Sequence, residues 1–252
     1  MSIESLEPLG TPIALLTDID GTIHSHECTT RFATEVWPKC KDHMFLIFLT
    51  GRTMADTLDS IRSYELPQPD IIVADVGTSW RRKKTNTEDQ HPFLFAVKRF
   101  PRNEVVRIME GFQDLNIQET CSPHRASYNI VGAVNKIMVE NALSNLMVDC
   151  LWSQDYLDIL PQGVNKGTVA SHIINCLIPS EAVVILAGNS YNDSHLFIDV
   201  RQPCHRVVPN DTDQSLIEEL SRSTDCILPE GNGVDGVLTL IQELLSDTTK
   251  GG

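Results

Sequence analysis

Two carboxylates near the start of the chain have the spacing needed for chemistry on a phosphate ester. Asp18 and Asp20 are separated by one residue, and they follow an apolar run that begins at Ile13. The run is too short for a helix and ends at the acids and Gly21, so it predicts a buried strand. We expect this strand to present both carboxylates at its C-terminal end, where open α/β sheets bind ligands.

Such a pair of carboxylates needs a counter-charge. Mg²⁺ fits, because it binds hard oxygen ligands and keeps positions open for water and a phosphate. With a phosphate ester bound, one carboxylate could attack phosphorus and form an acyl phosphate. The other could protonate the leaving alcohol and then activate water. For this segment taken alone, an Asp-Gly turn whose carboxylates only accept local N–H bonds is the simpler alternative.

A hydroxyl and a backbone amide follow a second apolar run, over residues 44–49. Thr50 and Gly51 would lie at the C-terminal end of that strand, just before a helix predicted over residues 54–63. This arrangement predicts a cradle for a phosphate oxygen. Arg52 is a candidate for substrate binding, and a structural ion pair is the alternative that we favour for it.

The rest of the chain contains more of the same alternation between strand-like and helix-like segments. Further strands are predicted at residues 70–75, 182–187, 204–208 and 226–228. Further helices are predicted at residues 168–176, 215–220 and 234–245. An early helix that includes Phe32 should end or bend at Pro38. The βαβαβ order predicts an α/β fold, a Rossmann-like doubly wound parallel sheet with both faces covered.

Residues 79–161 interrupt this alternation. They begin with a basic stretch at residues 80–84, for which a solvated loop is expected. Helices are predicted at residues 104–115 and 133–146, and strands at residues 125–131, 147–152 and 156–160. We therefore expect an inserted α/β cap domain at residues 79–161, between core segments 1–78 and 162–252. It should lie over the C-terminal edge of the sheet as a lid.

Four sequence motifs carry a resemblance to a known family. They are DIDGT at residues 18–22, TGR at residues 50–52, PDIIV at residues 69–73 and DVGT at residues 75–78. Together they resemble the haloacid dehalogenase superfamily of phosphatases. Within it, the chain is similar to the branch that contains sucrose-phosphate phosphatase and the mannosyl- and glucosyl-phosphoglycerate phosphatases. Members of that branch carry a mobile α/β cap between the second and third motifs.

The resemblance implies a sugar-binding segment in the cap. Residues 123–127 read Pro-His-Arg-Ala-Ser and align with a segment that presents a cation and a serine to the sugar, with Arg replacing a Lys. It implies that His124, Arg125 and Ser127 contact the substrate. Strand alternation would place Arg125 and Ser127 on one face. A surface Arg on an edge strand remains the alternative.

Lys166 stands at the start of a predicted helix, where its charge opposes the helix dipole. A placement that is locally unfavourable indicates a function. In the resembled superfamily, the matching lysine neutralises the nucleophilic carboxylate and the phosphate, and the resemblance implies this role for Lys166.

A loop at residues 188–193 reads Gly-Asn-Ser-Tyr-Asn-Asp, where the superfamily usually has G-D-x-x-N-D. The first acid of that motif is commonly a direct magnesium ligand, and Asn189 takes its place here. The resemblance implies that Asp18, the Asp20 carbonyl, Asn189 and Asp193 surround Mg²⁺, and that Asn192 contacts the substrate. We expect weaker magnesium binding, because an amide oxygen carries no charge.

Composition excludes several classes of protein. The 252 residues carry a formal net charge of -14, which argues against a nucleic-acid or anionic-membrane binder. The seven cysteines include no C-x-x-C pair, a pattern that is typical of reduced thiols in the cytoplasm. Neither a signal peptide nor an apolar run of bilayer length is recognisable. We expect a cytoplasmic monomer or weak homodimer.

The motifs together predict a magnesium-dependent phosphomonoesterase that acts on a sugar phosphate or a glycosyl-phosphoglycerate through an aspartyl phosphate. In this interpretation Asp18 is the nucleophile and Asp20 is the general acid and then the base. Thr50 and the Gly51 amide hold the phosphate. A phosphohexomutase would share these residues. A non-catalytic sugar-phosphate-binding scaffold is the other alternative, because Asn189 replaces the usual acid.

Overall fold

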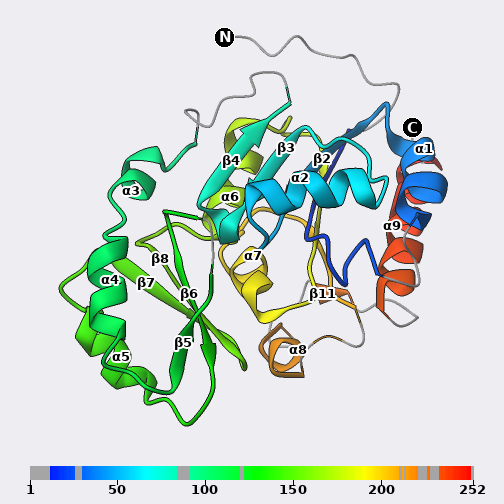
Figure 1. Ribbon diagram of the computed structural model, residues 1–252. Helices are drawn as coiled ribbons and strands as arrows, with labels where there is room; N and C mark the ends of the chain where they lie inside the picture. Colours follow the sequence, from blue (N-terminus) through cyan, green and yellow to red (C-terminus); the bar gives the residue numbers. More distant parts are fainter. Residues whose placement is uncertain are drawn as a thin grey trace.

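The chain forms two β-sheets that lie beside each other (Figure 1). The computed structural model describes residues 12–25, 30–83, 91–119, 122–209, 212, 214–220, 226–227 and 233–250. Seven strands make the larger sheet, in the order β11-β10-β9-β1-β2-β3-β4. They are β1 (Ile13–Thr17), β2 (Met44–Leu49), β3 (Ile71–Ala74), β4 (Ser79–Arg82), β9 (Val183–Ala187), β10 (His205–Val207) and β11 (Cys226–Ile227).

Strand β1 lies at the centre of the larger sheet and is buried along its whole length. It pairs in parallel with β2 on one side and β9 on the other, so that Thr17 lies between Phe48 and Ala187. The segments that follow β1, β2 and β9 therefore emerge together at one edge. This edge carries Asp18, Thr50 and Asn189, as expected for the C-terminal edge of a parallel sheet.

Helices cover both faces of the larger sheet. One face packs against the π-helix η1 (Phe32–Val36), α1 (Trp37–Cys40), α2 (Met54–Ser63) and α9 (Gly233–Lys250). The other face packs against α6 (Lys166–Cys176), α7 (Ser194–Ile198) and α8 (Gln214–Leu220). Pro38 falls in the first turn of α1, where proline is tolerated, and the helix changes there from π to α geometry. The predicted doubly wound α/β fold is confirmed.

The smaller sheet is antiparallel, in the order β5-β6-β8-β7. Its strands are β5 (Leu115–Ile117), β6 (Ala126–Ile130), β7 (Val148–Trp152) and β8 (Tyr156–Pro161), accompanied by helices α3 (Leu94–Lys98), α4 (Arg102–Met109) and α5 (Lys136–Leu143). Tyr128 and Leu157 turn toward α4 and α5 and form an apolar core with them. By alternation, Ser127 and Asp158 lie on the opposite face.

The basic stretch at the start of the insertion is not a loop, so that prediction is wrong. Residues 79–82 form β4, which pairs antiparallel with β3 at the edge of the larger sheet. Trp80 is buried in the core of that sheet, and this packing orders the strand despite its charged neighbours. Strand β4 thus joins the sheet of the expected core, and Lys84 lies outside the described residues. The strand β5 was not predicted.

Other expectations concern thiols and membranes. Among the described residues, Cys40, Cys150, Cys176 and Cys204 form no disulfide. In the described part of the chain, no helix has the length and apolar character needed to cross a bilayer. The N-terminal segment in which no signal peptide was recognised lies outside the described residues.

Two segments of the chain connect the larger sheet with the smaller one, and they come into close contact at Gly77. This residue follows Asp75 and Val76 in the short 3-10 helix η2 (Asp75–Gly77), and its φ is +108°. A Cβ at Gly77 would lie 2.6 Å from the backbone carbon of Asn165, which immediately precedes α6. Glycine is therefore required twice here, for its conformation and for the close approach of the second connection.

We expect Gly77→Ala to lower the free energy of unfolding by about 3 kcal/mol or more, because strain and a backbone clash add. Gly163→Ala is the matched control, since Gly163 also has a positive φ (+72°) but nothing within 4 Å of its would-be Cβ. It should cost only about 1 kcal/mol. Urea unfolding measures both. Equal losses would show that the contact with Asn165 is unimportant.

Candidate active site

A buried lysine lies at the centre of the cluster of predicted site residues. Helix α6 begins at Lys166, and the side chain of Asn165 caps it with a reciprocal bond to Thr168. The ammonium of Lys166 is fully buried, and it lies 3.2 Å from Asp18 Oδ1, 2.8 Å from Asn192 Oδ1 and 2.6 Å from Asp193 Oδ1. An ammonium has three hydrogens, so these three acceptors satisfy it.

The charges in this cluster do not cancel. Burial raises the pKa of Asp18 to about 7, and the charge of Lys166 opposes that rise. Burial also disfavours the charge of Lys166, but Asp18 and Asp193 together raise its pKa above the ordinary value. Two carboxylates therefore share one cation in a buried place. An additional cation beside Asp18 would relieve this imbalance.

Asp193 holds the loop that carries Asn189. Its Oδ2 accepts hydrogen bonds from the backbone N of Asn189 and from both the N and the Oγ of Ser190, at 3.0–3.2 Å. Its Oδ1 accepts from Lys166. Both oxygens of this fully buried carboxylate are thus engaged, and the loop is fixed against the start of α6.

Asn189 has the free oxygen that a metal site requires. Its side chain lies against the turn after β1, where a Cβ at Gly21 would be 2.1 Å from its Nδ2. Its Oδ1 is buried and has no hydrogen-bond partner among the described residues. An amide oxygen at the same edge of the sheet as the Asp18 carboxylate is a hard donor that suits Mg²⁺. Within the described ranges, no three acidic, His or Cys side chains gather around one point, which agrees with the replacement of the usual acid.

The turn after β2, for which a phosphate cradle is predicted, brings Gly51, the residue after Thr50, close to Asn192. Thr50 is buried, and its Oγ1 accepts a hydrogen bond from the backbone N of Arg52, which leaves the hydroxyl hydrogen able to donate elsewhere. Gly51 lies beside Asn192, whose Nδ2 would be 3.3 Å from a Cβ at Gly51. The hydroxyl, the Gly51 amide and the Asn192 amide thus lie at one edge.

Asp20, the second carboxylate of the DIDGT motif, pairs with Arg52, whereas Asp18 pairs with Lys166. Asp20 forms a two-point ion pair with Arg52, at 2.6 Å to Nε and 2.8 Å to the terminal nitrogen. The hydroxyl of Tyr64 lies 3.3 Å from that same terminal nitrogen. The structural ion pair that we favoured for Arg52 is therefore present. Strand β1 ends at Thr17, so Asp18 and Asp20 lie between the strand and the turn at residues 21–23.

Immediately before β6 of the smaller sheet, Arg125 is buried between two carboxylates. It is 7% exposed, and its terminal nitrogens lie 3.6 Å from Asp75 Oδ1 and 3.8 Å from Asp158 Oδ1. Ser127 donates a hydrogen bond to Asp158 Oδ1 and so lies on the same face. The alternative of a surface Arg on an edge strand is wrong, because Arg125 is buried and β6 lies between β5 and β8.

His124 lies beside this cluster with other contacts. Its backbone N donates to Ser122 Oγ, and its ring is close enough to His91 to act on it electrostatically. Burial, with a smaller contribution from His124, lowers the pKa of His91. The contacts that the structure describes for His124 are therefore with neighbours other than Asp75 and Asp158.

Two acidic residues of the site were missed by sequence reasoning. Asp75 follows the apolar strand β3 in the same way that Asp18 follows β1, and that pattern could have identified it. Burial raises its pKa, while Ser79 and Arg125 oppose the rise. Asp158 is the one acid in the otherwise apolar strand β8, and its pairing opposite Ser127 depends on the register of the sheet.

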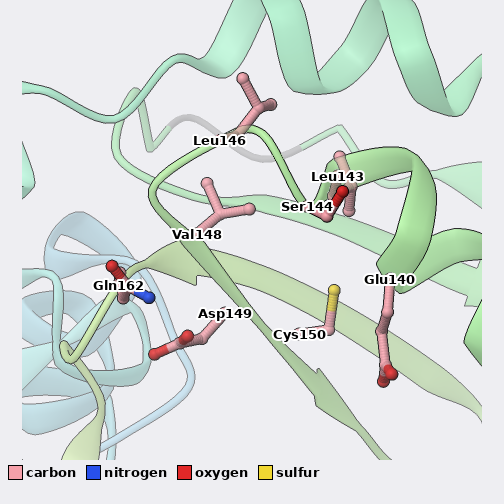
Figure 2. A pocket seen from close by; sticks show the side chains of 8 residues that line it. All are labelled: Glu140, Leu143, Ser144, Leu146, Val148, Asp149, Cys150 and Gln162. Carbon is pink, nitrogen blue, oxygen red and sulfur yellow. The ribbon is translucent and has the colours of Figure 1, made fainter.

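A pocket of about 270 Å³ lies elsewhere, between α5, β7 and the turn that joins them (Figure 2). Its lining consists of Glu140, Leu143, Ser144, Leu146, Val148, Asp149, Cys150 and Gln162. None of the predicted site residues lines it. Burial raises the pKa of the Cys150 thiol to about 12, so this cysteine is not a reactive nucleophile. We therefore place the candidate active site at the buried charged cluster around Lys166 rather than at this pocket.

Comparisons with known proteins point in one direction. The model of the sucrose-6F-phosphate phosphohydrolase family matches residues 11–243. Over 184 residues, 71% of this chain, the sequence is 33% identical to glucosylglycerol-phosphate synthase of Pseudomonas anguilliseptica, of which the match spans 24%. Over 196 residues it is 26% identical to mannosylfructose-phosphate phosphatase of Agrobacterium fabrum, which covers 74% of this chain and 79% of that protein.

A solved structure has the same fold. Sucrose-phosphatase of Synechocystis sp., determined with sucrose and phosphate, superposes with a TM-score of 0.76 and covers 92% of this chain and 98% of its own. The two sequences are 19% identical, so this likeness speaks to the fold alone.

We expect the metal-free protein to lose stability as the pH rises from about 4 to about 7. The pKa of Asp18 is raised from 3.8 to about 7 by folding, so in this window the folded state holds a proton that the unfolded state releases. The free energy of unfolding should fall by up to about 4 kcal/mol across it. Urea unfolding in the presence of a chelator measures this slope.

Asp18→Asn is the control for that measurement, because it removes the titrating group and keeps the shape of the side chain. Most of the pH dependence should disappear in this variant. If the slope were unchanged, another group would be responsible for it.

Proposed function

Because the chain belongs to the sucrose-6F-phosphate phosphohydrolase family, we propose that it is a magnesium-dependent phosphatase that hydrolyses a phosphorylated sugar or a glycosyl-phosphoglycerate. The observation that carries this proposal is the buried contact of Lys166 with Asp18 and Asp193. It places a cation against a carboxylate at the C-terminal end of the central strand, where a phosphate would meet both.

Asp18 is the proposed nucleophile. Its carboxylate oxygen attacks phosphorus and forms an aspartyl phosphate, and the bond from phosphorus to the leaving sugar oxygen breaks. Lys166 lies 3.2 Å from Asp18 Oδ1, and its charge opposes the rise in the pKa of Asp18 and so favours the ionised form that attack requires. Water then attacks the aspartyl phosphate, which releases phosphate and restores the carboxylate.

Asp20 is the proposed general acid and base. It gives a proton to the leaving sugar oxygen and later takes one from the attacking water. In the structure its carboxylate is paired with Arg52. To donate a proton, Asp20 must exchange Arg52 for the leaving oxygen, and its side chain is exposed enough to turn.

The phosphate is held at the turn after β2. The Thr50 hydroxyl and the Gly51 amide donate hydrogen bonds to its oxygens, and Asn192 contributes its Nδ2 from the opposite side. The Oδ1 of Asn192 accepts from Lys166, which fixes the direction in which Nδ2 points. These donors act on charge that grows on the phosphate oxygens in the transition state.

Mg²⁺ would be held by the Asp18 carboxylate, the Asp20 carbonyl and Asn189 Oδ1, the oxygen without a partner. When bound, it supplies positive charge that neutralises Asp18 and the phosphate. Asp193, whose oxygens already accept from Lys166, Asn189 and Ser190, orients this loop rather than contacting the ion directly.

The smaller sheet with α4 and α5 is the proposed cap, and it selects the substrate. Arg125 and Ser127, with Asp158 between them, face the end of β3 in the larger sheet. Val76 of the larger sheet packs against Leu151 and Leu160 of the smaller one, and this contact supports a cap over this edge. From the resemblance we also assign His124 to the sugar side of the site.

We expect Asp18→Asn to reduce phosphate release by at least about 10⁴-fold, because no nucleophile remains. The assay is phosphate release, with and without Mg²⁺, from sucrose 6-phosphate, mannosylfructose phosphate, glucosylglycerol phosphate and glucosyl-3-phosphoglycerate. Asp59→Asn, on the exposed surface of α2, is the control and should retain activity.

Three outcomes would contradict the proposal. Substantial turnover by Asp18→Asn would remove this residue from the chemistry. Isomerised product after addition of a bisphosphorylated sugar would identify a phosphohexomutase. Stabilisation by these ligands without any phosphate release by the unaltered protein would identify a non-catalytic binder.

We expect Asn189→Asp to lower the magnesium concentration needed for half-maximal activity by about 10-fold or more, because a charged ligand replaces a neutral one. Calorimetric titration with Mg²⁺ provides the same comparison without turnover. Asn189→Ala should change both values in the opposite direction. Identical magnesium affinity in all three proteins would exclude Asn189 as a ligand.

A further inference from the structure

A buried polar cluster joins the two sheets, and its distances are too long for hydrogen bonds. Arg125 lies 3.6 Å from Asp75 and 3.8 Å from Asp158. Among the described residues, neither Asp75 Oδ1 nor Arg125 Nε has a hydrogen-bond partner, although both are buried. Buried polar groups of this kind are normally satisfied, so these two atoms lack a partner that a polar ligand could supply.

A hydroxyl group carries both the donor and the acceptor that the two unpaired atoms lack. It can donate its hydrogen to Asp75 Oδ1 and accept from the Nε–H of Arg125. A carboxylate could only accept, so it would satisfy Arg125 and leave Asp75 without a donor. The unpaired atoms therefore favour a hydroxyl-bearing ligand.

The net charge of the cluster also favours a neutral hydroxyl ligand over a carboxylate. Two carboxylates, Asp75 and Asp158, face the single guanidinium of Arg125, so the cluster already has more negative than positive charge. A ligand carboxylate placed here would meet like charge in a buried place, where such repulsion is strong. A neutral polyol meets no such repulsion.

The cluster borders the proposed phosphate cradle. The backbone N of Asp75 donates to the carbonyl of Arg52 at 2.7 Å, and that of Val76 donates to the carbonyl of Thr50 at 3.1 Å. A side-chain carbon of Val76 would lie 4.0 Å from a Cβ at Gly51. The Arg125 cluster therefore adjoins the proposed phosphate cradle through Asp75 and Val76.

We propose that Asp75 is a specificity-determining residue that accepts a hydroxyl group from the non-phosphorylated part of the substrate and excludes substrates with a carboxylate there. The inference rests on the proposed function, because that function places the phosphate at Thr50 and Gly51. It selects neutral glycosyl phosphates and rejects glycosyl-phosphoglycerates.

The test uses two probes that differ in one group. Glucosylglycerol has a hydroxymethyl group where glucosylglycerate has a carboxylate. Calorimetric titration of the unaltered protein should give at least about 10-fold tighter binding of glucosylglycerol. Asp75→Asn should bind glucosylglycerate at least about 10-fold more tightly than the unaltered protein does, and lose most of the preference. A variant that failed to fold could not gain affinity.

Asp70→Asn is the matched control, because Asp70 precedes the same strand at its opposite end and accepts from the backbone N of Leu46. It should leave both affinities unchanged. Equal binding of the two probes by the unaltered protein, no binding of glucosylglycerol, or an unchanged preference in Asp75→Asn would overturn the inference.

Phosphate release from p-nitrophenyl phosphate, which carries no sugar, separates this inference from the proposed function. Binding of glucosylglycerol with the expected preference, but no phosphate release from p-nitrophenyl phosphate or from any of the glycosyl phosphates named above, would contradict the phosphatase and support the role of Asp75. Release of phosphate without the preference would do the reverse.

Discussion

The buried ammonium of Lys166 is the interaction on which the arrangement of the site depends. It connects the end of β1, through Asp18, to the 188–193 loop, through Asn192 and Asp193. Removing one partner of a buried ion pair leaves an uncompensated charge, which is strongly destabilising. The first residue of helix α6, Lys166, must therefore lie beside the C-terminal end of the central strand β1. Since α6 directly follows the smaller sheet, this contact also anchors the chain where it returns to the larger sheet.

A second constraint lies where the chain leaves the larger sheet. Asp75 and Val76 both have positive φ values, a conformation that is costly for residues with side chains. It turns the Asp75 carboxylate toward Arg125 and the Val76 side chain toward Leu151 and Leu160. Strain at this point is offset by contacts with the smaller sheet. Each end of the proposed substrate thus meets one buried cation shared by two carboxylates, Lys166 with Asp18 and Asp193 at the phosphate and Arg125 with Asp75 and Asp158 at the sugar.

Several residues have partners that differ from the simplest interpretation of their motifs. The two carboxylates of DIDGT are separated by their cations, since Asp18 meets Lys166 and Asp20 meets Arg52. Asp193 was expected near the metal, but both of its carboxylate oxygens accept hydrogen bonds from other residues of the protein. The oxygen left without a partner belongs to Asn189. The same loop therefore combines a rigid support with one free ligand.

The sequence alone determined the fold class and the family, and the family match confirms the resemblance drawn from the motifs. Apolar runs that end at Asp18 and Thr50 predict parallel strands, because burial on both faces removes polar residues from them. Local pattern could not reveal β4, since its order comes from Trp80 packing into the core. Nor could it pair Arg125 with Asp75, about fifty residues away in sequence, because sheet register and the chain crossing at Gly77 bring them together. Contacts between distant segments depend on tertiary packing, and only the folded chain decides them.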